Sequence, residues 1–206
     1  MFQKFREKKL LSKISAFKNI DGWLTDKEAQ GLYIVASKLP ANASVVEIGS
    51  WQGKSTYCIA KGLKSGVIYC IDPFNADGGM DVQSQDEYNR KKGSKDLLES
   101  FSENMQQLDV INKLKIKKGY SYQFSEDFSK IDFLFIDGDH SIEGCKMDFD
   151  MYASKIISGG YIAFHDYYHD RPELGPTHVI DNIVSISKQY RFFKQYDSLW
   201  IAQKII

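Results

Sequence analysis

The alternation of strand-like and helix-like segments from residue 44 onward constrains the fold more than any other feature of the chain. Short apolar runs are separated by stretches in which apolar residues recur at helical spacing. Strands are predicted over 44–49, 66–72, 113–119, 131–138 and 161–166, and a closing hairpin over 191–196 and 199–206. This order predicts an α/β fold whose doubly wound, seven-stranded sheet is mostly parallel, ends in an antiparallel hairpin and carries helices on both faces.

The segments between the strands carry signals for helices and loops. Thr25 and Glu28 have the spacing of a capping box, which predicts a helix that ends before Pro40. Further helices are expected over 55–63, over 95–108, from Ser141 to a stop at Gly159 and Gly160, and over 179–190. The polar segment 74–96 is expected to be a long loop, either a lid or disordered.

The composition argues against several classes of function. Net charge is zero over 206 residues, so no global electrostatic attraction to nucleic acid is expected. Lysines on one face of segment 113–119 instead favour a guarded edge strand. No apolar run approaches the ~18 residues of a membrane span, and the N-terminus lacks the apolar stretch of a secretory signal. Three cysteines without a paired motif indicate reduced core residues of a cytoplasmic protein. They are Cys58, Cys70 and Cys145.

The first 18 residues are basic and amphipathic. Six basic residues (Lys4, Arg6, Lys8, Lys9, Lys13, Lys18) are interleaved with five apolar ones (Phe2, Phe5, Leu10, Ile14, Phe17). Such a helix can lie on a membrane or a partner, but we favour a terminal helix that packs on the domain with a solvated lysine face. We therefore expect a helical extension over 1–40, a single domain over 41–206 and no stable membrane insertion. The sequence leaves a homodimer open.

The segment "EIGSWQGKST", residues 47–56, is similar to two phosphate-binding loops and satisfies neither pattern. A P-loop needs four residues between its first glycine and G-K-[ST], and only three separate Gly49 from Gly53. A dinucleotide loop needs glycine where Trp51 stands, because the pyrophosphate must approach the backbone there. Glu47, at the strand end, opposes an anion and favours a cation or an ammonium group. The loop therefore indicates a ligand without phosphate.

Asp72 narrows the choice of ligand. It ends the next predicted strand, and ligands of doubly wound sheets bind at the carboxyl ends of the strands. One carboxylate can accept two hydroxyl hydrogen bonds, which suits a ribose diol. S-adenosylmethionine has a ribose, an amino group and no phosphate, so we predict it as the cofactor.

The pattern of Glu47, Gly49, Trp51, Gly53 and Ser55 resembles motif I of class I methyltransferases. It is most similar to the catechol O-methyltransferase type and the macrocin-O-methyltransferase-like family, in which an aromatic residue replaces the middle glycine. The segments "CIDPF", "GYS", "FLFIDGDHS" and "GGYIAFHDYY" add to the resemblance, which runs from "DGWLTDKEAQ" to the final hairpin. It implies a Rossmann-like methyltransferase that transfers a methyl group from S-adenosylmethionine to a hydroxyl of a small polar or sugar-like acceptor.

The resemblance also implies a set of cofactor-binding residues. They are Glu47, Gly49, Ser50, Trp51, Gly53, Ser55, Asp72, Tyr120, Ser121 and Asp137. The first two would lie near the methionine part of the cofactor, and Ser55 would bind its carboxylate together with backbone amides at a helix start. Asp72 would hold the ribose, and Tyr120 and Ser121 would border the adenine.

Acidic and histidine side chains follow the fourth and fifth predicted strands. Neighbouring parallel strands lie about 4.8 Å apart, so Asp137 and Asp166 are expected to repel each other unless a proton or cation lies between them. Oxygen ligands favour Mg²⁺, Ca²⁺ or Mn²⁺, and we expect His165 to complete a divalent-metal site with these two residues. In the resembling families such a metal binds substrate hydroxyls, which implies catalytic roles for Asp137 and, as the base, for His140.

Several alternatives stay open at this point. The acidic groups could form a metal-free site, and His140 could simply orient the following helix. The chain could be an NAD-dependent oxidoreductase, although Trp51 and Glu47 argue against it. It could also be a non-catalytic binding module that retains the fold.

Overall fold

The computed structural model describes the backbone of residues 2–77 and 82–206, and the side chains of 8–77 and 85–206. One seven-stranded sheet has the order β3-β2-β1-β4-β5-β7-β6. The strands are β1 (Ala43–Ile48), β2 (Gly66–Asp72), β3 (Leu114–Lys118), β4 (Ile131–Ile136), β5 (Ile156–Phe164), β6 (Tyr190–Tyr196) and β7 (Leu199–Lys204). The first five strands pair in parallel, and β7 runs antiparallel to both of its neighbours. The predicted fold class is confirmed, as is the edge position of β3.

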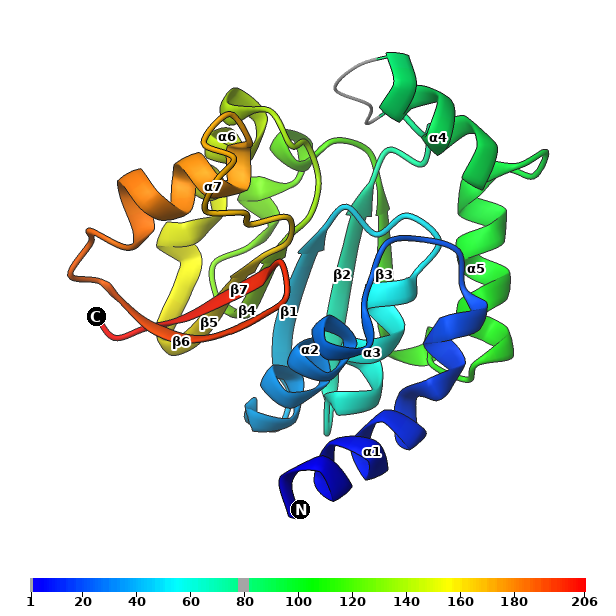
Figure 1. The fold of residues 1–206 in the computed structure, drawn as a ribbon, viewed down its shortest axis with the longest axis horizontal. Coiled ribbons are helices and arrows are strands. Elements are labelled where there is room, and N and C mark those ends of the chain that lie inside the picture. Colours follow the sequence, from blue (N-terminus) through cyan, green and yellow to red (C-terminus); the bar gives the residue numbers. More distant parts are fainter. Residues whose placement is uncertain (1, 78–81) are drawn as a thin grey trace.

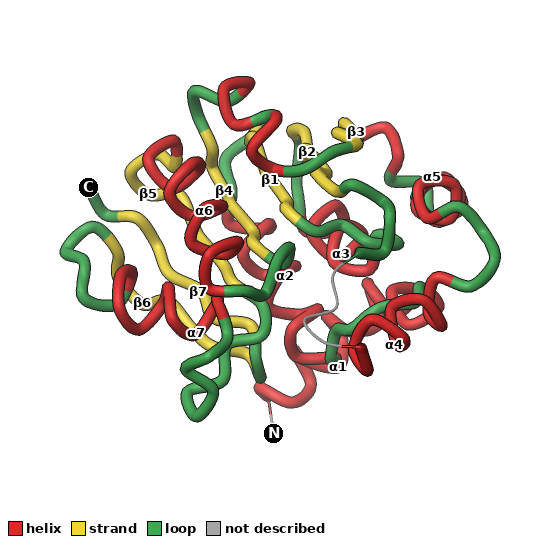
Figure 2. The backbone as a smooth tube through the Cα atoms, turned by 90° about the horizontal axis from the view of Figure 1, so that it is seen from above, coloured by secondary structure: helices red, strands yellow, loops and turns green. Residues whose placement is uncertain are grey.

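Helices cover both faces of this sheet (Figure 1). They are α1 (Phe2–Ile14), α2 (Asp26–Lys38), α3 (Lys54–Gly62), α4 (Val82–Lys92), α5 (Leu97–Gln107), α6 (Ile142–Tyr152) and α7 (Gly175–Val179). One apolar core joins the sheet to α2, α3 and α5, and a second joins it to α6 and α7. Viewed from above, β4, β1 and β2 separate α6 from α3 and α5 (Figure 2). Each face of the sheet therefore has its own core, as a doubly wound fold requires.

Two of the predicted helix starts, after Thr25 and after Ser141, are present. The Thr25 hydroxyl accepts a hydrogen bond from the backbone N–H of Glu28 (3.3 Å), and the Glu28 carboxylate accepts one from the N–H of Thr25 (2.8 Å). Ser141 caps α6 by accepting from the N–H of Gly144 (3.0 Å). These local signals were readable in the sequence because their partners lie three residues apart.

Three predicted boundaries are wrong. The helix after Ser141 ends at Tyr152, and Gly159 and Gly160 lie inside β5, where a register shift interrupts the pairing with β4. A Cβ on Gly160 would come within 3.0 Å of the Asp132 carbonyl oxygen, so the missing side chain permits close strand approach rather than ending a helix.

The other two errors concern segments 179–190 and 74–96. The helix predicted over 179–190 begins earlier, at Gly175, as α7, and continues as a π-helical turn (Ile180–Val184). Tyr190 already starts β6. Segment 74–96 is not simply a loop, because it contains α4. Residues 78–81 of this segment lie outside the described residues.

The N-terminal segment packs on the domain. Ile14 and Phe17 are buried in the core that joins α2 and α3 to the sheet. The expected basic and apolar side chains of residues 1–7 lie outside the described residues. Within the part of the chain that the structure describes, no helix is long and apolar enough to cross a membrane.

Candidate active site

A cavity of about 540 Å³ lies at the carboxyl ends of the parallel strands. Its wall is formed by residues from the segments 22–23, 48–55, 71–77, 119–122, 137–148 and 165–166, together with Tyr88 of α4. This is the place at which doubly wound sheets bind their ligands. The volume suits a ligand the size of a nucleoside derivative.

Asp72 joins the first two loops of the cavity. One of its carboxylate oxygens accepts hydrogen bonds from the backbone N–H groups of Ser50 (2.9 Å) and Trp51 (2.8 Å), and the other accepts from Phe74 N–H (2.6 Å). Burial raises the pKa of Asp72, and the three amide bonds counter this only in part. The side chain thus fixes both loops while it also forms part of the cavity wall.

Glu47 lies beneath the first loop and not on the cavity wall. Its side chain is fully buried and accepts hydrogen bonds from the hydroxyls of Ser50 (2.9 Å), Ser55 (2.7 Å) and Thr56. Burial raises the pKa of Glu47 to about 7, although the three hydroxyls oppose this rise. Glu47, which the family resemblance placed near the methionine part of the cofactor, therefore holds the loop from below. Ser50 and Ser55 lie between Glu47 and the cavity.

Close packing explains the glycines of this loop. Gly49 has a φ of +87°, and a Cβ there would come within 2.0 Å of the Asp137 carbonyl oxygen. Gly53 has a φ of +92° at the start of α3, and a Cβ there would come within 2.5 Å of Met105 on α5. Both positions need a left-handed backbone and the absence of a side chain. Gly53, unlike Gly49, does not line the cavity, so its place in the motif reflects helix packing.

The cavity wall also contains a buried carboxyl group, that of Asp148, which sequence reasoning missed. The Ser121 hydroxyl donates to Asp148 of α6, and the Tyr152 hydroxyl donates to the Ser121 carbonyl oxygen (2.6 Å). Burial raises the pKa of Asp148 to about 7. Tyr120 and Tyr122, stacked with their ring centroids 5.7 Å apart, form the exposed rim. The sequence signal that could have revealed Asp148 was the presence of an acidic residue on the apolar stripe of α6.

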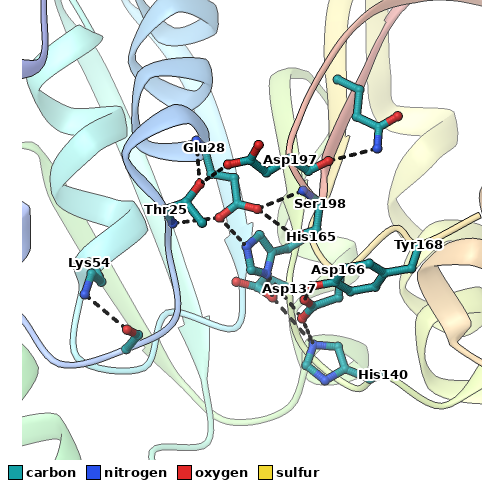
Figure 3. A network of polar contacts seen from close by, with 12 residues as sticks. Thr25, Glu28, Lys54, Asp137, His140, His165, Asp166, Tyr168, Asp197 and Ser198 are labelled. Carbon is teal, nitrogen blue, oxygen red and sulfur yellow. Dashed lines mark hydrogen bonds and ion pairs between the residues drawn. The ribbon is translucent and has the colours of Figure 1, made fainter. Parts of the chain in front are cut away.

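The acidic and histidine residues after β4 and β5 do meet (Figure 3). His140 Nε2 lies 3.3 Å from an Asp166 oxygen and 3.6 Å from an Asp137 oxygen. One ligand atom from each of these three residues lies within 4.8 Å of the other two, and among the described residues this is the one such group that could hold a metal ion. Burial lowers the pKa of His140, but the nearby Asp137 and Asp166 outweigh it and leave the pKa raised.

His165 lies beneath this group and is 4% exposed. Its Nδ1 is 3.3 Å from an Asp137 oxygen and 3.2 Å from an Asp166 oxygen, and its Nε2 is 3.3 Å from a Glu28 oxygen. Burial lowers the pKa of His165, but the three carboxylates raise it well above its usual value. Both ring nitrogens thus face carboxylates, and the group with metal-site geometry contains His140 where the sequence suggested His165.

Three aromatic rings close the cavity on the side of α4. Trp23 and Trp51 have centroids 5.6 Å apart, and Tyr88 of α4 lies 4.7 Å and 5.2 Å from them. The Gln52 side chain donates to the Lys91 carbonyl oxygen (3.2 Å), which ties the first loop to the end of α4. Within the described part of segment 74–96, α4 therefore borders the cavity through Tyr88.

A profile of the family described as "Methyltransferase domain" matches residues 46–167. The chain belongs to this family. The chain has the fold of the O-methyltransferase TomG from Streptomyces achromogenes, which was solved in complex with SAM. The two structures match with a TM-score of 0.66 at 14% identity, over 96% of this chain and 89% of the other. An O-methyltransferase from Bacillus cereus in complex with SAH gives a TM-score of 0.66 at 14% identity, over 97% of this chain and 90% of the other.

A curated relative is more similar in sequence. "Uncharacterized protein R132" of Acanthamoeba polyphaga mimivirus is 30% identical over 140 residues, which are 64% of this chain. The chain spans 56% of the length of that relative.

Proposed function

We propose that the chain is an S-adenosylmethionine-dependent O-methyltransferase that acts on a hydroxyl group of a small polar or sugar-like acceptor, assisted by a divalent cation. The observation that carries this proposal is one cavity with two chemically different ends. At one end, buried Asp72 and the Ser121–Asp148 pair face the cavity. At the other end, Asp137, His140 and Asp166 converge.

The first end has the donors and acceptors that S-adenosylmethionine requires. Asp72 would accept hydrogen bonds from the ribose hydroxyls, because its carboxylate reaches the cavity beside its three amide partners. Ser55, in the first turn of α3, would bind the methionine carboxylate through its backbone N–H, because its hydroxyl donates to Glu47. Asp148 would accept a hydrogen bond from the adenine amino group, beside Ser121 and Tyr120. The neighbours solved with SAM and SAH support this choice of ligand.

The second end would prepare the acceptor hydroxyl. S-adenosylmethionine supplies an electrophilic methyl group, so the acceptor oxygen must lose its proton as it attacks. His140 would accept this proton, and the carboxylates of Asp137 and Asp166 would stabilise the imidazolium that forms. The raised pKa of His140 makes it a stronger base than an ordinary histidine.

The same three residues fit a divalent cation. Two carboxylates and an imidazole nitrogen lie within 4.8 Å of one another, which suits Mg²⁺ or Mn²⁺. A bound cation would lower the pKa of the acceptor hydroxyl and hold its oxygen in place. His140 Nε2 cannot both bind a cation and accept a proton, so metal dependence decides which of its two roles applies. His165 would remain beneath the cation, with its Nδ1 facing Asp137 and Asp166.

Ligand binding and methyl transfer test the proposal in turn. Calorimetry is expected to detect binding of S-adenosylmethionine and S-adenosylhomocysteine but not of NAD. Transfer of labelled methyl groups to a panel of sugars, polyols and phenols then tests the reaction, before and after EDTA and with Mg²⁺ or Mn²⁺ added back. No binding of the first two ligands would contradict the proposal, and binding without transfer would favour a non-catalytic module. Full activity after chelation would exclude the cation and leave His140 as the base.

We further propose that the protein acts in the cytoplasm on a small molecule and not on nucleic acid. The zero net charge and the three free, buried cysteines support this. The helices within 1–40 would serve as an extension that covers one face of the domain at 41–206.

A further inference from the structure

Glu28, on α2, reaches the acidic group from outside the matched segment 46–167. It is 3% exposed, and every part of its carboxylate is engaged (Figure 3). One oxygen accepts from Thr25 N–H (2.8 Å) and forms an ion pair with His165 Nε2 (3.3 Å), a buried ring nitrogen whose contact with Glu28 lacks the geometry of a hydrogen bond. The other accepts from the N–H (2.9 Å) and hydroxyl (2.7 Å) of Ser198, in the turn between β6 and β7.

A capping box alone does not explain this arrangement. The glutamate of a capping box needs only the backbone N–H of the cap residue, and it can meet that need at the protein surface. Burying a carboxylate is costly unless it is paired. Burial raises the pKa of Glu28, but His165 and the other donors overcome this and lower it to about 2. The fold therefore keeps a charged carboxylate in its interior, against the buried histidine whose Nδ1 faces both Asp137 and Asp166.

We propose that Glu28 is a positioning residue of the active site, which holds the His165 ring so that its Nδ1 stays between Asp137 and Asp166. This inference rests on the proposed function, because it assigns Glu28 to the same reactive group. It makes α2 and the β6–β7 turn parts of the active site, although both lie outside the matched family segment.

The physical argument has two steps. The partner of one histidine ring nitrogen fixes the orientation of the whole ring, and with it the direction of the other nitrogen. His165 Nδ1 faces two carboxylates that end neighbouring strands and repel each other unless a proton or cation lies between them. Without Glu28 the ring loses its anchor on the far side, and the spacing of Asp137 and Asp166 is no longer fixed.

If Glu28 only stabilised the junction between α2 and the β6–β7 hairpin, its substitution would affect His165 no more than substitution of its neighbours in that junction. Thr25 donates from its hydroxyl to Asp197 (2.8 Å), and Lys27 forms an ion pair with Asp197 (2.7 Å). Thr25→Ala and Asp197→Asn therefore weaken the same junction without removing a contact of His165. They are matched controls for Glu28→Gln.

The side-chain ¹H–¹⁵N NMR spectrum of the metal-free protein tests the proposal directly. The chain has four histidines, and His165→Gln identifies the signals of the ring in question. Glu28→Gln is expected to shift both His165 ring nitrogens and to speed the exchange of its Nε2 proton with water, whereas the two controls leave both unchanged. Ser198→Ala removes only the hydroxyl that donates to Glu28 and is expected to give a smaller shift. This variant covers the case in which Glu28→Gln fails to fold.

Catalysis provides a second readout on an acceptor that the methyl-transfer panel identifies. Glu28→Gln is expected to lower kcat on the order of 10-fold to 100-fold while the KM for S-adenosylmethionine stays unchanged, as for residues that orient a catalytic group. Unchanged His165 signals in Glu28→Gln and Ser198→Ala, or equal shifts in Thr25→Ala, would overturn the proposal. The spectra need no substrate. If the protein had no methyltransferase activity, the proposed function would be refuted, and the spectra would still show whether Glu28 positions the His165 ring.

Discussion

The two ends of the cavity are built in different ways. The end that would bind the methyl donor, here called the donor end, is formed by the loops after β1, β2 and β3. Its side chains are held by contacts between residues 2 to 27 positions apart, such as Asp72 with Phe74, Glu47 with Ser55 and Ser121 with Asp148. The acid end, formed at the ends of β4 and β5, depends on His165 and on Glu28, whose contacts span most of the chain. A short motif can thus encode cofactor binding, while the reactive group requires the complete fold. The two ends should accordingly fail in different ways when they are changed.

The largest effect is expected at the acid end. Asp166→Asn keeps the size of the side chain but removes one of the two charges that face His140. Loss of this assistance to proton transfer is expected to lower kcat by on the order of 10²-fold to 10⁴-fold. Binding of S-adenosylmethionine, measured by calorimetry, should stay within about 3-fold because the donor end is intact. Asp170→Asn, at an exposed position in the same loop, is the control. Equal losses in binding and turnover would show that the two ends do not act separately.

The reverse pattern is expected for Asp72→Asn. The amide is neutral and retains one acceptor oxygen, so all three backbone N–H groups lose a charged partner and at least one of them loses its acceptor, as does the ribose. A hydrogen bond to a charged group contributes about 1.5–3 kcal/mol, so the affinity for S-adenosylmethionine should fall roughly 100-fold in calorimetry. Asp77→Asn, also on the cavity wall but exposed, should bind normally. An unchanged dissociation constant for Asp72→Asn would remove this residue from the cofactor site.

The buried carboxyl of Glu47 should give the donor end its own pH dependence. Its folded pKa, about 7, lies above the usual value of 4.5, so the fold favours the protonated form. Its contribution to stability is therefore fully present below pH 4.5 and declines as the pH rises through 7. Between pH 5 and pH 8, urea unfolding should reveal a loss of stability to which Glu47 contributes roughly 2 to 3 kcal/mol. Glu47→Gln should remove this part and leave the part that comes from Asp148, whose pKa is also raised to about 7. Glu99→Gln, at an exposed position, is the control, and an identical pH dependence in Glu47→Gln would contradict this assignment.

The smallest effect is expected for Ser121→Ala. The substitution removes a neutral hydroxyl that donates to Asp148, at a cost of about 1 kcal/mol. Binding of S-adenosylhomocysteine should weaken about 5-fold in calorimetry while kcat changes little. Ser125→Ala removes a similarly buried hydroxyl away from the cavity and should have no effect. A larger change in kcat than in binding would place Ser121 at the acid end instead.

The sequence predicted most of the fold because the signals are local and periodic. Alternating apolar segments gave β1 to β4 within a residue or two, and the capping residues Thr25 and Ser141 gave two helix starts. The errors at Gly159 and Gly160 have one physical cause. Glycine permits a helix stop, a bulge and a close strand approach alike, and only the neighbouring strand decides among them.

The candidate site was predicted as a set of strand ends, but not as a set of contacts. Strand alternation places Asp137 and Asp166 side by side in a parallel sheet, whichever helices cover it. It contains no information about the direction of a histidine ring, so the choice between His140 and His165 needed coordinates. The participation of Glu28 could not be read at all, because a capping box accounts for that residue completely at the level of sequence.

The aromatic rings that close the cavity have an optical consequence. Two of the three tryptophans of the chain, Trp23 and Trp51, contact each other and Tyr88 there, while Trp200 is buried in the hairpin. A ligand that enters beside Trp23 and Trp51, or a movement of α4, changes the environment of these two indoles. The fluorescence of Trp200 then remains as a constant background. The protein therefore contains its own fluorescent probe of cavity occupancy, which reports in real time and without a label.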